Sequence, residues 1–64
     1  MTKLQQMIIQ VLKQEGGPRN PNQMVDLLPK QNAIAIRNAC DQLVAIDILT
    51  KTENKVWGFS YSIK

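Results

Sequence analysis

The spacing of apolar residues changes at Asp47, and this change constrains the fold more than any other feature of the sequence. Before Asp47 the apolar residues recur with the period of an amphipathic helix. After it they alternate with polar or small residues, which is the period of a strand. The order predicts an α+β chain in which helices come first and a two-stranded antiparallel β-hairpin comes last.

Three helices are predicted before Asp47, over about residues 2–14, 21–28 and 33–46. Each begins at a side chain that can cap a helix, namely Thr2, Asn20 and Asn32. The first is expected to end at Gly16, because glycine accepts the left-handed backbone found there. The second is expected to end at Pro29, since the residue before a proline avoids helical geometry.

The hairpin is predicted from two alternating runs, at about residues 48–52 and 56–63, joined by a turn at residues 53–55. The second run places Phe59 and Tyr61 on one face, together with Trp57 and Ile63. A chain this short needs its large aromatic side chains for its core. All three aromatic residues are therefore expected inside, with a contact at the hairpin tip as the alternative for Trp57.

Packing alone must hold these elements together as one domain over residues 1–64. The chain has one cysteine, Cys40, and no histidine, so neither an internal disulfide nor a zinc site of the usual kind is expected. Cys40 is expected to be a buried small hydrophobe on the third helix. The inward face of that helix is predicted to consist of Ile36, Ala39 or Cys40, Leu43 and Ile46.

Several function classes are disfavoured by the same residues. Without histidine, a glycine-rich phosphate loop or paired carboxylates, no enzyme activity and no cofactor are expected. The longest apolar runs, at residues 33–36 and 43–46, are far shorter than the roughly 20 residues that span a bilayer. Glutamines interrupt the N-terminal segment, so it lacks a signal-peptide core. A cytoplasmic protein without a membrane partner is expected.

The stretch from Ile36 to Leu49 resembles the winged helix-turn-helix superfamily. Spaced apolar residues on its helix lead through a short turn into the first strand of the hairpin, called the wing in that family. Asp47 stands where the family usually has glycine, and aspartate tolerates left-handed geometry better than most residues. The resemblance is one of pattern over nearly the whole chain and identifies no subfamily. It implies a winged-helix domain that binds double-stranded DNA.

The resemblance also implies that the outward face of the third helix enters the major groove and that the wing follows the backbone. Arg37 would contact guanine or phosphate, Asn38 and Gln42 adenine, and the remaining residues phosphates. The candidate DNA-binding residues are Gln31, Asn32, Arg37, Asn38, Gln42, Lys51 and Lys55. The alternative is that the helix residues form a solvated face and the lysines keep the hairpin soluble. Asp41 counts against tight binding, because its carboxylate would face phosphates.

The leading hypothesis is therefore a small DNA-binding regulator of transcription or replication. Its short reading frame is typical of a bacterium, phage or mobile element. The net charge of +3 permits a polyanionic partner without requiring one. Ile9, Ile34 and Val44 lie off the apolar stripes and could form a homodimer surface. The alternatives are a winged-helix protein-interaction module without DNA binding, and a subunit whose hairpin extends a partner's sheet.

Overall fold

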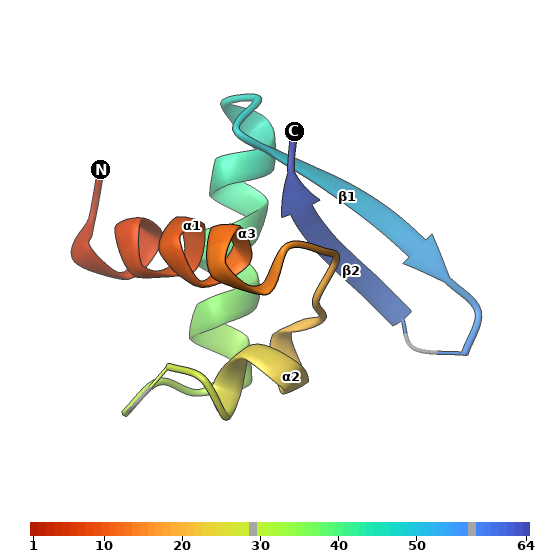
Figure 1. The fold of residues 1–64 in the computed structure, drawn as a ribbon, viewed down its shortest axis with the longest axis horizontal. Helices are drawn as coiled ribbons and strands as arrows, with labels where there is room; N and C mark the ends of the chain where they lie inside the picture. Colours follow the sequence, from red (N-terminus) through yellow and green to blue (C-terminus); the bar gives the residue numbers. More distant parts are fainter. Residues whose placement is uncertain (29, 57) are drawn as a thin grey trace.

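The computed structural model describes residues 1–28, 30–56 and 58–64, in which helices are followed by a two-stranded antiparallel hairpin (Figure 1). The helices are α1 (Lys3–Glu15), α2 (Pro21–Val25) and α3 (Ala33–Ala45). The strands are β1 (Leu49–Asn54) and β2 (Gly58–Ile63). The predicted α+β order is confirmed. The predicted stop at Pro29 and the burial of Trp57 fall on the two residues outside this description.

Each helix begins at the capping residue predicted for it. The Thr2 side chain accepts a hydrogen bond from the Gln5 amide, and the Gln5 side chain accepts one from the Thr2 amide. The same reciprocal pair joins Asn20 and Gln23 at the start of α2. Asn32 accepts from the amide three residues further on. These bonds satisfy amides that a helix leaves without partners, so they fix where each helix starts.

Helix α2 is shorter than predicted, because its hydrogen-bond ladder stops at Met24. The amides of Leu27 and Leu28 both donate to the Met24 carbonyl, at 3.0 and 2.9 Å, so the helix ends at Val25 and a turn follows. Helical periodicity predicts that Met24, Leu27 and Leu28 share the buried face of the second helix. Met24 and Leu28 are buried, but Leu27 is 42% exposed, so the prediction is wrong for Leu27.

A left-handed residue closes α3, as the sequence predicts for Asp47. Its φ is 69°, and its amide donates to the Val44 carbonyl while the Ile48 amide donates to the Leu43 carbonyl. This pair of bonds is a Schellman motif, which turns the chain directly from the helix toward β1. The prediction that Ile46 faces inward is wrong. Ile46 is the cap residue after the last helical turn and is 58% exposed.

The hairpin is paired further toward its tip than predicted. Glu53 pairs with Phe59 and Asn54 with Gly58, so the predicted turn at residues 53–55 is wrong. The reason is Gly58, whose φ of 80° suits the turn geometry that leads into β2. The Asn54 side chain also accepts a hydrogen bond from the Val56 amide at 2.8 Å, which bends the chain after β1.

The core lies where α1 crosses α3 and where both meet the base of the hairpin (Figure 1). Its buried apolar members are Ile8, Leu12, Met24, Leu28, Ile36, Ala39, Cys40, Leu43, Leu49 and Tyr61. Cys40 is buried as predicted, and burial, with the Asp41 charge adding to it, raises the pKa of its thiol to about 12. No helix in the described part of the chain is long and apolar enough to cross a membrane.

Phe59 does not join this core, contrary to the prediction, since it is 38% exposed, and Ile63 on the same strand is 36% exposed. The hairpin diverges from the helices toward its tip, so only part of its inner face is covered (Figure 1). Tyr61 is fully buried, and its backbone pairs with Arg19 on the side of β2 opposite β1. The Arg19 amide donates a hydrogen bond to the Tyr61 carbonyl at 3.0 Å, and the Tyr61 amide donates one to the Arg19 carbonyl at 2.8 Å.

The two adjacent glycines after α1 should respond differently to alanine. Gly16 has a φ of 72° and open space at the Cβ position, so Gly16→Ala adds only backbone strain. We expect it to lower the free energy of unfolding by about 1 kcal/mol. Gly17 lacks a positive φ, and an added Cβ would make only an ordinary contact with Arg19. Gly17→Ala should leave the free energy of unfolding unchanged or raise it slightly. Urea titrations of the wild type and both variants measure the difference. Equal losses in the two variants would contradict this assignment.

Candidate functional site

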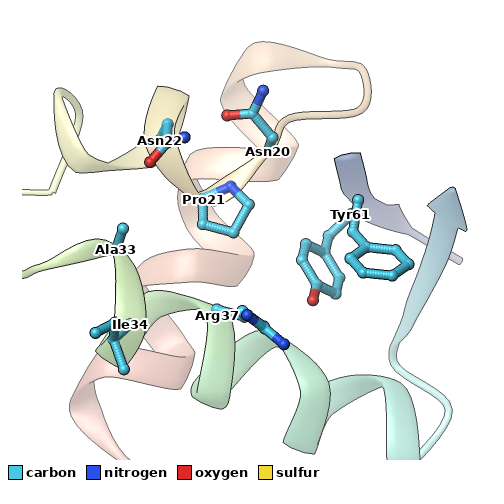
Figure 2. A pocket seen from close by; sticks show the side chains of 8 residues that line it. Asn20, Pro21, Asn22, Ala33, Ile34, Arg37 and Tyr61 are labelled. Atoms are coloured by element: carbon cyan, nitrogen blue, oxygen red, sulfur yellow. The ribbon is translucent and has the colours of Figure 1, made fainter. Parts of the chain in front are cut away.

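A groove with a volume of about 250 Å³ lies where the start of α2, the first half of α3 and β2 meet (Figure 2). Its lining residues are Asn20, Pro21, Asn22, Ala33, Ile34, Arg37, Phe59 and Tyr61. Segments far apart in the sequence meet here because the Arg19 bridge holds the start of α2 beside β2. The groove combines an apolar wall with one cationic side chain.

Arg37 is the cation of this groove. It is exposed, and its side chain extends from α3 toward Tyr61 (Figure 2). Among the described residues, no carboxylate lies within ion-pair distance of its guanidinium. Its positive charge contributes to lowering the pKa of Asp41. Arg37 is therefore exposed on α3, as the helical period predicts.

Asp41, one turn further along α3, is held by the hairpin. Its Oδ1 atom accepts a hydrogen bond from the Tyr61 hydroxyl at 2.6 Å and another from the Lys51 ammonium at 3.1 Å. The carboxylate therefore joins α3 to both strands. The sequence suggested that Asp41 would present an uncompensated negative charge. Instead, Lys51 balances that charge within the fold.

Lys51 is engaged on the same face of the hairpin. Besides the ion pair with Asp41, its Nζ atom lies 4.1 Å from the ring centre of Phe59 and 5.8 Å from that of Tyr61. A cation over aromatic rings is attracted to their negative faces. These interactions of Lys51 are thus intramolecular, and they include the partly exposed ring of Phe59.

The ionisation of this cluster follows from its geometry. The hydrogen bond from Tyr61 is the largest cause that lowers the pKa of Asp41, and the bond and charge of Lys51 lower it further against the opposing effect of burial. Burial, and then the hydrogen bond to Asp41, raise the pKa of Tyr61. The hydroxyl therefore stays protonated as a donor and the carboxylate stays charged as an acceptor at neutral pH.

The other predicted contact residues fall into two groups. Asn38 is exposed on α3 and Lys55 is exposed near the hairpin tip, both directed to solvent. Gln42 instead contacts α1, because its Oε1 accepts a hydrogen bond from the Gln5 side chain at 2.8 Å. Gln31 is half-buried before α3, and Asn32 uses its side-chain oxygen as the cap. The structure therefore leaves Arg37 and Asn38 exposed on α3, whereas the side-chain oxygen of Gln42 on the same helix is bonded to α1.

The apolar residues proposed for a dimer surface differ in their exposure. Ile9 and Val44 are half-buried and pack against the core, whereas Ile34 is 73% exposed beside the groove. Sequence reasoning missed the role of the Tyr61 hydroxyl, since alternation marks a side chain as inward without naming its partner. In the described part of the chain, no three of the cysteine, aspartate and glutamate side chains are grouped so that they could hold a metal ion.

Comparisons with protein-family models, with curated proteins and with solved structures find no match to this chain.

A double-mutant cycle tests the contact between α3 and β2. Tyr61→Phe removes the buried hydroxyl, and Asp41→Asn removes the charge that it meets. Because a hydrogen bond to a charged group is stronger than a neutral one, the two losses should couple by about 1 to 2 kcal/mol in the free energy of unfolding. The measurement is urea unfolding of the wild type, both single variants and the double variant. Strictly additive losses would show that the two groups do not interact.

Low pH should reduce the free energy of unfolding, partly through protonation of Asp41. A carboxyl group whose pKa is lowered by folding stabilises the folded state above its unfolded pKa of about 3.9. That contribution is lost as the pH falls through the lower pKa of the folded state. Asp41→Asn should therefore have a free energy of unfolding that declines less steeply below about pH 4. Urea titrations between neutral pH and pH 2 measure it, and parallel curves for the two proteins would exclude the effect.

Proposed function

We propose that this chain is a winged-helix domain that binds double-stranded DNA, with α3 in the major groove and the hairpin as the wing along the backbone. The order of the elements supports this: the short α2 is followed by the longer α3, as in helix-turn-helix proteins, and an antiparallel hairpin comes after α3. A role in regulating transcription or replication is part of the same proposal.

One observation carries the proposal. The carboxylate of Asp41 is compensated by Lys51, while Arg37 on the same helix is exposed and has no ion-pair partner among the described residues. A phosphate or a guanine approaching α3 therefore meets a donor fork with no free anion beside it. Asn38 lies next to Arg37 and offers the amide group that pairs with adenine.

The exposed lysines around this face add to the proposal. Lys30 lies in the turn before α3 and Lys55 lies near the hairpin tip, and both side chains are exposed. Cations on either side of the recognition helix suit the two phosphate strands that border a major groove. Affinity should come from these contacts, while Arg37 and Asn38 supply the preference for particular base pairs.

Titration of the full chain with a fluorescent random-sequence duplex tests the proposal. Binding should be measurable at about 50 mM salt and should fall steeply toward 200 mM, because each phosphate contact releases counterions. Arg37→Ala should weaken binding by about 5- to 100-fold, and if Arg37 contacts phosphate the slope of log affinity against log salt should fall by about 1.

Lys13→Ala provides the matched control. This substitution removes one positive charge from the last turn of α1, on a side chain that does not line the groove. Its affinity should stay within about twofold of the wild type, since charges outside the contact release no counterions. Absence of binding at low salt would contradict the proposal. So would equal losses in the Arg37 and Lys13 variants.

A protein-interaction module is the second candidate, and the apolar wall of the groove favours it. Pro21, Ile34 and Phe59 line that wall together with the cation of Arg37. Such a surface would accept a peptide segment with an acidic residue between apolar side chains. The same titration distinguishes the two candidates, because this module would leave the duplex unbound at every salt concentration.

A further inference from the structure

Ile34 is an exposed apolar residue on the otherwise polar face of α3 that carries Arg37 and Asn38. It lies in the first turn of α3 and is 73% exposed, although three of its neighbours in the helix, Ala33, Ala35 and Ile36, are half-buried or buried. Single exposed aliphatic residues are common on protein surfaces. This one stands beside the only residues of α3 that are proposed to contact bases, so its chemistry bears on what that face can recognise.

The helix places Ile34 and Asn38 on the same side. Residues four apart in an α-helix are neighbours about 6 Å apart along the axis, and Arg37 adjoins both. Ile34 and Arg37 also line the same groove. The face therefore presents, within one helical turn, an apolar side chain, an amide and a guanidinium.

An apolar side chain can contact one feature of the major groove favourably. Thymine carries a methyl group at C5 there, whereas the other major-groove features are hydrogen-bond donors and acceptors. An A·T pair offers this methyl together with the adenine edge that pairs with an amide such as that of Asn38. Against a hydrogen-bond donor or acceptor in the major groove, an isoleucine would instead remove water from that polar group without replacing its hydrogen bond.

We propose that Ile34 contacts the 5-methyl group of thymine, so that this protein prefers duplexes that carry a methyl group at pyrimidine C5 in the major groove. The inference rests on the proposed DNA binding and specifies its preferred ligand. A cytosine methylated at C5 presents the same methyl group at the same position. The preference should therefore extend to 5-methylcytosine.

Two pairs of synthetic duplexes isolate the methyl group. One pair is alternating dA-dT against alternating dA-dU, and the other is alternating dG-dC methylated at C5 of cytosine against its unmethylated form. Fluorescence anisotropy at one low salt concentration should give the wild type an affinity about fourfold higher for the methylated member of each pair. That ratio corresponds to about 0.8 kcal/mol, which is the transfer free energy of one buried carbon group.

Substitutions at Ile34 assign the preference to this side chain. Ile34→Ala should bind both members of each pair equally, whereas Ile34→Val should keep a reduced preference. Val56→Ala is the matched control, because Val56 is an equally exposed aliphatic residue near the hairpin tip, at 78%. It should keep the full preference. Circular dichroism confirms that each variant is folded, as expected for changes at exposed positions.

The outcomes separate the two proposals. Binding of all duplexes with no preference in the wild type overturns the role of Ile34 and leaves DNA binding intact. A preference that persists in Ile34→Ala also overturns it, since the methyl group then acts through duplex shape. Binding to none of the duplexes overturns both proposals and leaves Ile34 as part of a protein-binding surface.

Discussion

The carboxylate of Asp41 is the contact on which the arrangement of this protein depends. It lies between an α-helix and a hairpin that share little apolar surface toward the hairpin tip, and it accepts hydrogen bonds from Tyr61 and Lys51. A short chain without cross-links has few ways to fix two such elements relative to each other. Two hydrogen bonds to one charged acceptor fix the orientation of the hairpin relative to α3, whereas apolar packing between small surfaces is not directional.

The same contact relates stability to surface charge. Asp41 and Lys51 carry opposite charges, and each compensates the other within the fold. The partly exposed ring of Phe59 lies beside the same lysine. The charge that remains available on this face is above all that of Arg37, which has no ion-pair partner in the part of the chain that the structure describes. The fold thus determines which charges are available to a ligand.

Much of this fold was predictable, because its boundaries depend on local chemistry. The reciprocal caps at Thr2 and Asn20 and the left-handed Asp47 are encoded within a few residues, and the structure confirms them. The hairpin register was not predictable in the same way. Gly58 favours a turn closer to β2, while alternation alone placed that turn earlier.

The candidate site was predictable only in part, and the reason is also physical. The exposure of Arg37 and Asn38 follows from helical periodicity, which the sequence shows. The partners of Lys51 and Gln42 lie on other elements, so their engagement depends on how those elements pack. A pattern along the chain identifies a polar residue as outward. It does not say whether another part of the same chain will cover it.

The direct junction between α3 and β1 limits where this protein can change in length. Because the Schellman motif at Asp47 connects helix to strand within a few residues, an inserted residue there would turn every side chain of β1 to the opposite face. Lys51 would then leave Asp41. Near the hairpin tip, by contrast, the side chains of Lys55 and Val56 are exposed. Insertions should therefore be tolerated at the hairpin tip, where the reach of the hairpin can vary while the junction keeps its length.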